Sequence, residues 1–295
     1  MRFLRWLVAT ALIGAVGLWV LARPSGLSEA AVAGLTGDTA KGELVFWASG
    51  CASCHMAASA KGQGQLVLTG GQRFPSDFGT FVAPNISQDP DHGIGGWSLL
   101  DLANALTRGV SPEGAHYYPA LPYASYAKMR LQDVADLHAF LKTLPPDPTP
   151  SQPHDLGFPF SLRRTIGLWK LLYLNDDWVV PGSLTPTAER GRYIAEALAH
   201  CGECHTPRTA LGGMDTARWL GGAPNPSGQG RIPNVTPAKL GWTAPDIVQY
   251  LTTGFTPEFD SVGGHMAHVV GNMARLPEGD RQAVAEYLRA VPDVE

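Results

Sequence analysis

The sequence Cys-x-x-Cys-His occurs twice in this chain of 295 residues. The two copies use all four cysteines, in Cys51-Ala52-Ser53-Cys54-His55 and Cys201-Gly202-Glu203-Cys204-His205. Two cysteines at this spacing can each bond to a haem vinyl group, and the histidine that follows becomes an axial ligand of the iron. We therefore expect two covalently bound haem c groups, one held by Cys51, Cys54 and His55 and the other by Cys201, Cys204 and His205.

Two other kinds of site use closely spaced cysteines, and the sequence argues against both. A structural zinc site needs four cysteine or histidine ligands, whereas each pentad offers three and has no second Cys-x-x-Cys nearby. A thioredoxin-like redox pair belongs beside a β-α-β pattern and has no need of the following histidine. The recurrence of the whole pentad, with no cysteine left over, favours a dihaem c-type cytochrome.

The surroundings of the pentads are repeated as well. A predicted helix leads into each pentad, and a glycine-rich loop follows that reaches Pro84-Asn85 or Pro233-Asn234, 33 and 32 residues after Cys51 and Cys201. Each copy then has a Gly-Trp pair, a short helix ending at glycine, and an amphipathic closing helix. The repeated segments are the leading helices 38–50 and 187–200, the Gly-Trp pairs 96–97 and 241–242, the glycines Gly109 and Gly254, and the closing helices 131–143 and 280–290.

This repeat predicts an all-α fold with two tandem class I cytochrome c-like haem domains. The domains are expected at residues 38–145 and 186–295, since a chain of this length suits two domains of roughly 100–120 residues. Residues 25–37 are a predicted linker to the N-terminal segment, and residues 146–185 are a predicted linker between the domains. The 34 glycines and 24 prolines of the chain indicate that long loops connect the helices.

The inter-domain linker is expected to contain one short helix. Its proline-rich start should be stiff and non-helical. Residues 161–174 have one apolar face, with Ser161 as the expected N-cap. Arg163, Arg164 and Lys170 would suit a helix on a membrane surface. We favour the alternative, a helix packed across the two haem domains.

The N-terminus has the pattern of an export signal. Arg2 and Arg5 precede an uncharged run of 17 residues, 6–22, which is just long enough to span a bilayer. Cleavage after Ala33 is an alternative, but that position lies well beyond the apolar run. We expect residues 1–24 to form a retained anchor in the bacterial inner membrane, with the rest of the chain in the periplasm.

The charge of the exported part bears on its partners. The chain has 22 basic and 26 acidic residues; without Arg2, Arg5 and Arg23, 19 basic residues remain, and the net charge is −7. An acidic protein of this kind is not expected to bind nucleic acid. It suits instead a redox partner with a basic docking surface.

Four stretches within residues 38–292 carry a family resemblance. They are Asn85-Ile86-Ser87, Gly93-Ile94-Gly95-Gly96-Trp97-Ser98, Tyr118-Pro119-Ala120-Leu121-Pro122-Tyr123 and Cys201-Gly202-Glu203-Cys204-His205-Thr206-Pro207-Arg208. The chain resembles the cytochrome c subunits of membrane-bound periplasmic dehydrogenases of the alcohol, gluconate and fructose type, and especially their dihaem relatives. The resemblance implies electron transfer from a flavin, quinone-cofactor or molybdenum subunit to ubiquinone or the respiratory chain. Many of those subunits have three haems, and this chain departs from them in having two pentads.

An electron-carrying haem c usually has a methionine opposite its histidine. In the second predicted domain the candidate is Met266, 14 residues before Asp280 of the closing helix, with Met273 as its rival. Alignment on the closing helices puts Leu121 at the position of Met266.

Leucine cannot bind iron, so the first predicted domain needs another ligand or none. In the three-haem subunits that the chain resembles, the position of Leu121 is commonly methionine, in a Pro-Ala-Met-Pro-Tyr motif. Three arrangements remain open: Met129 as the ligand, which we place first, His116 as the ligand, or an iron with an open face.

Two functions follow from these alternatives. The first is a membrane-anchored electron carrier without substrate chemistry of its own, which passes electrons from a periplasmic dehydrogenase or another donor to a soluble cytochrome c, a quinone site or a terminal oxidase. The second is a redox enzyme, such as a peroxidase or a sulfur-compound oxidoreductase, with catalysis at the first haem. We favour the carrier, because the sequence repeats no acid–base constellation near either pentad.

Overall fold

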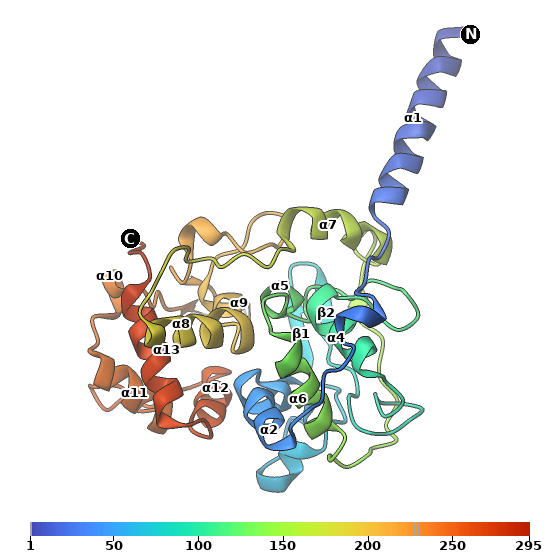
Figure 1. The fold of residues 1–295 in the computed structure, drawn as a ribbon. Coiled ribbons are helices and arrows are strands. Elements are labelled where there is room, and N and C mark those ends of the chain that lie inside the picture. The colour runs from blue at the N-terminus through green and yellow to red at the C-terminus, as the bar shows by residue number, and fades with distance from the viewer. Residues whose placement is uncertain (1, 227, 229) are drawn as a thin grey trace.

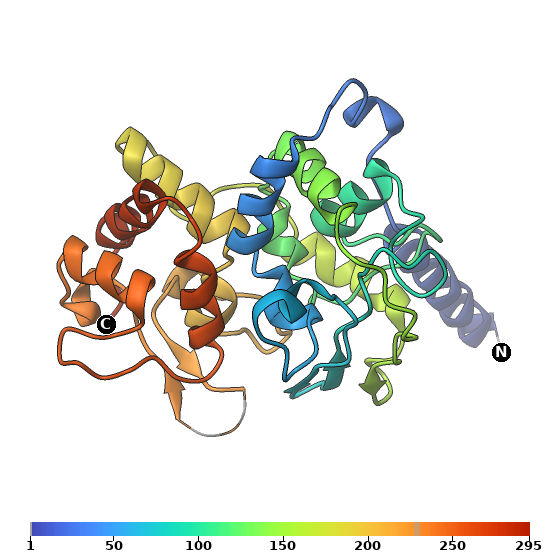
Figure 2. The same cartoon turned by 90° about the horizontal axis from the view of Figure 1, so that it is seen from below.

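The computed structural model describes residues 2–226, 228 and 230–295, so Met1, the first residue of the predicted anchor, lies outside the described residues. Helices dominate, and the strands are short. We call the elements α2 to α6 the first unit and the elements α8 to α13 the second unit; each contains one pentad. The two units lie side by side in Figures 1 and 2, and α1 (Arg2–Leu21) projects away from them as a single long helix.

The first unit begins with the helix that leads to the first pentad. Asp38 caps this helix, because its carboxylate accepts hydrogen bonds from the N–H groups of Ala40 and Lys41 at 2.9 and 3.1 Å. The helices of the unit are α2 (Thr39–Ala48), α3 (Cys51–His55), the 3-10 helix η2 (Gly62–Leu66), α4 (Leu99–Arg108), α5 (Tyr123–Tyr126) and α6 (Leu131–Leu141). A small antiparallel sheet joins them, in the order β1 (Arg73–Ser76), β2 (Gly79–Val82) and β3 (Asp155–Leu156).

The second unit repeats this plan with one change in its leading helix. The predicted continuous α-helix over 187–200 is wrong in detail: an α-helical part is followed by a π-helical part, in which the Ala199 N–H donates to the Ile194 carbonyl at 2.7 Å. The elements are α8 (Pro186–Arg192), the π-helix η4 (Tyr193–Leu198), α9 (Gly202–His205), the 3-10 helix η5 (Thr216–Arg218), β4 (Ala223–Pro224), β5 (Arg231–Ile232), α10 (Pro237–Leu240), α11 (Ala244–Thr253), α12 (Met266–Met273) and α13 (Glu278–Ala290).

The π-helical part carries a buried carboxylate. Glu196 is 1% exposed, and its Oε1 accepts a hydrogen bond from the Tyr287 hydroxyl at 2.6 Å. The N–H groups of Val179 and Val180 donate to the same carboxylate at 2.6 and 3.1 Å. These bonds satisfy a group that would otherwise be costly to bury. They also tie the segment before α8 to the core of the second unit.

The first and last helices of each unit cross at a glycine. A Cβ atom on Gly42 would lie 1.9 Å from the carbonyl oxygen of Asp136 on α6, and one on Gly191 would lie 1.9 Å from that of Ala283 on α13. No side chain fits in either place, so the backbones of α2 and α6, and of α8 and α13, touch. The predicted leading and closing helices are therefore present and paired in the same way in both units.

Short helices of the two units also share their end signals. α4 begins with a capping box formed by Ser98 and Asp101, and α11 begins with one formed by Thr243 and Asp246. Both helices end at a glycine in the left-handed conformation, as the sequence predicts. The buried apolar side chains of the two units join in one connected cluster. The units are thus packed against each other rather than separated.

The segment between the units crosses both of them. It contains a short 3-10 helix, η3 (Arg163–Thr165), and α7 (Ile166–Tyr173). The predicted cap at Ser161 is wrong, because the Ser161 N–H closes a turn with the Gly157 carbonyl and the helix begins later. The predicted packing across both units is confirmed: Lys170 Nζ donates to the Gly109 carbonyl of the first unit at 2.7 Å, and the Tyr173 hydroxyl lies 2.8 Å from Thr209 Oγ1 of the second.

The N-terminal helix is apolar along its whole length. α1 has 20 residues, no side chain buried against the protein, and a mean hydropathy of 1.9 over its most apolar window. By length and composition it meets the requirement for crossing a bilayer. A signal sequence near the N-terminus would meet it as well.

The close crossing at Gly42 makes a prediction about stability. We expect Gly42→Ala to lower the free energy of unfolding by about 1–3 kcal/mol, because the added methyl group forces α2 away from α6. The matched control is Gly279→Ala in α13, where a Cβ would meet no atom within 4 Å and helix propensity favours alanine. Denaturant unfolding of the haem-loaded protein, followed by circular dichroism, measures both. A Gly42→Ala variant as stable as the parent would contradict the packing argument.

Candidate functional site

Each pentad forms a single helical turn at a bend in the chain. α3 follows Gly50, which has a φ of 64°, and the second pentad follows His200, which has a φ of 42°. A residue in the left-handed region ends the leading helix and turns the chain sharply into the pentad. Glycine adopts this conformation readily, whereas a histidine in it is uncommon. The same bend thus presents both pentads, although different residue types form it.

The histidine of each pentad is oriented by a proline carbonyl. His55 Nδ1 lies 2.8 Å from the Pro84 carbonyl oxygen, and His205 Nδ1 lies 2.8 Å from that of Pro233. A carbonyl oxygen only accepts hydrogen bonds, so Nδ1 carries the proton and Nε2 keeps its lone pair. This is the arrangement in which a histidine binds a metal through Nε2, with its other nitrogen held by a second group.

The proline carbonyls explain a repeat whose purpose the sequence did not reveal. Pro84 and Pro233 belong to the Pro-Asn pairs found at matching distances after the two pentads, and the equal spacing was the only signal of their role. Both chains of contact also include a backbone bond from the pentad itself. The carbonyl of His55 accepts from Gly70 N–H, and that of His205 accepts from Gly222 N–H, both at 2.7 Å.

The asparagine of each pair holds its loop in place. The Asn85 side chain donates to the carbonyls of Asp147 and Thr149, both at 2.8 Å, and accepts from the Ser87 N–H at 2.8 Å. Asn234 donates to the Val294 carbonyl at 2.7 Å and accepts from the Thr236 N–H at 2.9 Å. Each asparagine therefore binds the loop to the chain that follows the closing helix.

The donor set of each pentad fits haem c. None of the four cysteines, all of them described, forms a disulfide, and burial raises the pKa of Cys51 and of Cys201 to about 12, so these residues are thiols. Burial also lowers the pKa of His55 and His205, which favours the neutral imidazole that binds iron. Two thiols and one free imidazole nitrogen on a single turn are the groups that haem c uses.

The zinc alternative has no ligand set in the structure. Within residues 2–226, 228 and 230–295, no group of three or more histidine, cysteine, aspartate or glutamate residues is placed to hold a metal ion. A tetrahedral structural zinc site would require four such ligands together. The pentads therefore do not complete one another as a zinc cluster.

The two candidate positions for a methionine ligand correspond in space. Val110 forms an isolated β-bridge with His116, and Phe255 forms the equivalent bridge with Ser261. Leu121 comes five residues after the first bridge, and Met266 comes five residues after the second. Both side chains are half-buried against the apolar core. The bridges give the same equivalence that the closing helices gave from sequence.

The other candidate ligands lie elsewhere. Met129 is 5% exposed and stands two residues before α6, the place that Leu276 takes before α13. Met273, the rival of Met266, is 3% exposed at the end of α12. His116 is 3% exposed, and its Nε2 lies 2.8 Å from the Ala22 carbonyl oxygen at the base of α1. His116 thus contacts the N-terminal segment, while Met129 and Met266 stay predicted ligands.

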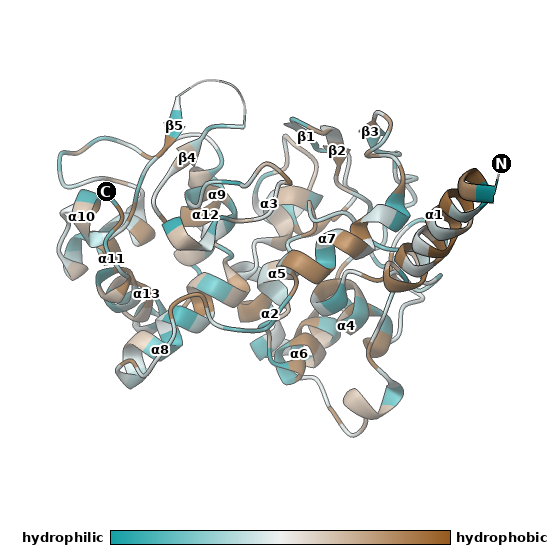
Figure 3. Ribbon diagram, turned by 90° about the horizontal axis from the view of Figure 1, so that it is seen from above, coloured by the Kyte–Doolittle hydropathy of each residue, from teal (hydrophilic) through white to brown (hydrophobic). Residues whose placement is uncertain are grey.

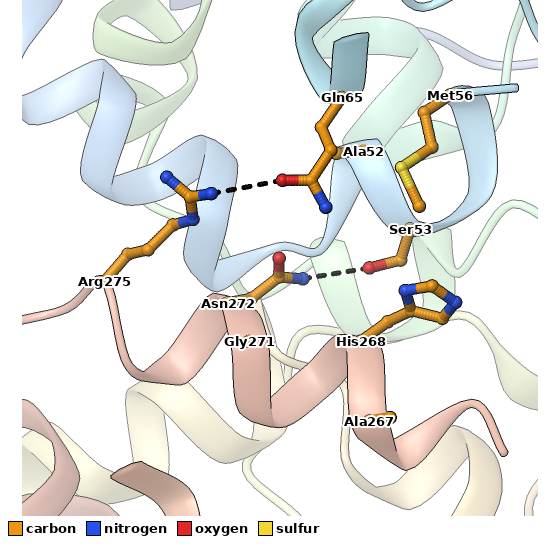
Figure 4. A pocket seen from close by; sticks show the side chains of 9 residues that line it. All are labelled: Ala52, Ser53, Met56, Gln65, Ala267, His268, Gly271, Asn272 and Arg275. Atoms are coloured by element: carbon orange, nitrogen blue, oxygen red, sulfur yellow. Dashed lines mark hydrogen bonds between the residues drawn. The ribbon is translucent and has the colours of Figure 1, made fainter. Parts of the chain in front are cut away.

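The helix of the first pentad contacts the second unit directly. Asn272 on α12 donates to Ser53 Oγ at 2.9 Å, and Arg275 donates to Gln65 Oε1 at 3.1 Å, across a small pocket that Figure 4 shows. The second pentad makes the reverse contact, because Ser125 of the first unit donates to Glu203 Oε1 at 3.2 Å. Each pentad is therefore tied to the opposite unit.

The second cysteines of the two pentads are near each other. The charge of a Cys204 thiolate would raise the pKa of Cys54, in addition to the larger effect of burial, which together bring it to about 11. Tyr126 donates from its hydroxyl to the Ser49 carbonyl at 2.9 Å, and His200 lies beside the same carbonyl. The pentads and the bends before them thus meet at the interface between the units.

Comparison with known proteins gives one family. The cytochrome c family model matches residues 39–145. The chain is 59% identical, over 282 residues, to a diheme cytochrome c-type protein of Cereibacter sphaeroides, with 96% of this chain and 95% of that protein covered.

Dehydrogenase subunits are more distant relatives. The chain is 34% identical over 312 residues to the fructose dehydrogenase cytochrome subunit of Gluconobacter japonicus, with 99% of this chain and 60% of the subunit covered. It is 33% identical over 271 residues to the cytochrome c subunit of a quinone alcohol dehydrogenase of Gluconobacter oxydans, with 86% and 55% covered. The chain thus spans little more than half the length of these two subunits.

The asparagines that hold the loops allow each half of the site to be disturbed separately. We expect Asn85→Ala to lower the free energy of unfolding by about 2–4 kcal/mol, because it leaves buried backbone groups without partners. It should also raise one of the two reduction potentials, because a looser Pro84 carbonyl polarises the His55 imidazole less. Asn234→Ala is the matched variant and should raise the other potential.

A spectroelectrochemical titration of the haem-loaded protein measures both effects. The argument fails if Asn85→Ala and Asn234→Ala move the same midpoint, or if neither moves one while stability falls.

Proposed function

Because the chain belongs to the dihaem c-type cytochromes and is homologous to the cytochrome c subunits of fructose, alcohol and gluconate dehydrogenases, we propose that it carries electrons through two haem c groups. Cys51, Cys54 and His55 would hold one haem, and Cys201, Cys204 and His205 the other. Haem c supplies an iron that changes between the ferrous and ferric states and so accepts and releases one electron. In this proposal residues 38–145 and 186–295 are two class I haem domains.

The observation that carries the proposal is the meeting of the two pentads. Ser53 of one pentad and Glu203 of the other each bind a side chain of the opposite unit, and the charges of Cys54 and Cys204 interact. The chain thus brings both attachment points to one interface and fixes them there by hydrogen bonds. A rigid, short separation between two redox groups is what transfer inside one protein requires. An enzyme that uses each site separately would not need it.

The location and partners follow from α1 and from the relatives. We propose that α1 anchors the protein in the bacterial inner membrane, that residues 25–37 link it to the haem domains, and that these face the periplasm. A membrane-bound dehydrogenase is the proposed electron donor, since three relatives are named as cytochrome subunits of such enzymes. A soluble cytochrome c, a quinone or a terminal oxidase in the respiratory chain is the proposed acceptor.

One observation favours a second function at the first unit. Leu121 takes the position that Met266 has in the second unit, and its side chain has no atom that can bind iron. If Met129 does not supply the ligand instead, the first site would be open to a small molecule. The protein would then pair one catalytic site with one electron-transfer site, as in a peroxidase or a sulfur-compound oxidoreductase.

Removal of the thiols tests the number and attachment of the haems. The double variant Cys51→Ala/Cys54→Ala should contain half as much covalently bound haem per chain as the parent, and Cys201→Ala/Cys204→Ala should lose the same amount. The pyridine haemochrome spectrum, measured after acid–acetone extraction of unattached haem, gives the haem content. An unchanged content in either variant would overturn the assignment of that pentad.

Carbon monoxide distinguishes the carrier from the enzyme. The spectrum of the reduced parent protein should not change with carbon monoxide if both irons have strong ligands on both sides. Met266→Leu should then open one iron and make about half of the haem reactive, and Met129→Leu should open the other. A parent protein in which half of the haem already reacts would favour catalysis at the first unit. Parent-like behaviour of Met129→Leu in an otherwise closed protein would exclude Met129 as the ligand.

A further inference from the structure

The helix between the units has its charged and apolar faces reversed. Lys170 of α7 points into the protein, where its Nζ donates to the carbonyls of Arg108 and Gly109 at 2.6 and 2.7 Å. Leu171 and Leu172 on the other side are 64% and 63% exposed. A helix on the surface of a water-soluble protein does the opposite, with its leucines inside and its lysines outside. The exposed face of α7 is therefore built for an apolar environment.

Further exposed apolar side chains surround this face. Leu211 belongs to the same surface, since its carbonyl accepts a hydrogen bond from the Trp169 indole of α7 at 3.0 Å. We call the whole set the α7 patch: Phe158, Phe160, Leu162, Leu171, Leu172 and Leu211, which are between 43% and 87% exposed in a surface where most other large apolar side chains outside α1 are buried. Figure 3 shows α7 and α1 as the strongly apolar helices of this face. An exposed apolar cluster of this kind marks a contact surface.

The α7 patch lies at the base of α1. The backbones of α7 and the end of α1 touch, because a Cβ on Gly167 would lie 2.3 Å from the Ala22 carbonyl oxygen. Arg164 donates to the Trp19 carbonyl at 2.8 Å and stacks over the Trp19 ring at 4.7 Å. In Figure 1, α7 lies along the side of the body from which α1 projects. Any bilayer that surrounds α1 therefore meets this side of the body.

We propose that the α7 patch rests on the surface of the bilayer that α1 crosses, an inference that depends on the proposed anchoring of α1. The charges around the patch suit this position. Arg23 directly follows the span, and Arg163 and Arg164 lie beside the patch, where each can face lipid phosphates. Trp19 is 62% exposed near the end of α1, at the depth where tryptophan is enriched in membrane proteins.

Contact with the bilayer would fix the orientation of the whole protein. α7 is bonded to the first unit through Lys170 and to the second through Trp169 and Tyr173. A single span such as α1 leaves a protein free to tilt and rotate about it, whereas a second contact beside the span removes this freedom. Both pentads would then stand at fixed heights above the membrane, which suits exchange with partners that are themselves in the membrane.

Photocrosslinking of the full-length, haem-loaded protein in phosphatidylcholine/phosphatidylglycerol vesicles tests the proposal. Three single variants carry p-benzoylphenylalanine, at Leu172 in the α7 patch, at Trp19 in α1 and at Leu44 in α2. Leu44 is the matched control, a helical leucine that is 37% exposed on an element away from α7. The haem absorbance spectrum of each variant shows that it has folded. We expect lipid adducts by mass spectrometry from Trp19 and Leu172 and none from Leu44.

The other outcomes separate this inference from the anchoring on which it depends. Adducts from Trp19 without adducts from Leu172 would overturn the contact of the α7 patch and leave the anchor intact. Absence of adducts from both would overturn the anchor and the patch contact together, without affecting the electron-transfer proposal. Illumination in native membranes gives a further check: a protein adduct at Leu172 in place of the lipid adduct would make the α7 patch a protein interface and overturn the proposal.

Discussion

The backbone contact at Gly42 and Gly191 is the constraint on which each unit depends. It presses the leading helix against the closing helix, so that residues about 100 positions apart in the chain are joined at one crossing. The pentad follows the leading helix after one sharp bend, and its place is therefore fixed by the same crossing. The chain between the pentad and the closing helix is mostly loop, and the carbonyl of Pro84 or Pro233 binds it back to the pentad histidine. A side chain at the crossing glycine would separate the helices and move all of these parts.

The two units use this common frame and still differ where an iron ligand is concerned. The bridges of Val110 and Phe255 show that the loops before Leu121 and Met266 follow the same path. A loop side chain can change there without disturbing the helix crossing, because it contributes little to the contact between the helices. The pentad, by contrast, is bound on both sides by backbone hydrogen bonds that recur in both units. Duplication of such a unit therefore preserves the attachment site and leaves the opposite face free to diverge.

The interface between the units gives the duplication its use. Hydrogen bonds from Asn272 to Ser53 and from Ser125 to Glu203 join each pentad to the other unit, and one apolar core runs through both. α7 adds a third connection on a different side, with its lysine buried and its leucines exposed. The units are thereby held as one body in which the two attachment sites are close and the side beside α1 is apolar.

The sequence by itself determined the attachment residues, the duplication, the leading and closing helices and the apolar N-terminal helix, because each of these depends on local spacing or periodicity. Only the tertiary structure decided what lies beside them. The π-helical turn at Tyr193–Leu198 depends on the partners of buried Glu196, and the contact of His116 with Ala22 joins residues 94 positions apart. The Pro-Asn pairs are visible in the sequence as a repeat, but their hydrogen bonds to the histidines span 29 and 28 positions. Contacts over such distances follow from how the helices pack, which no local pattern of residues records.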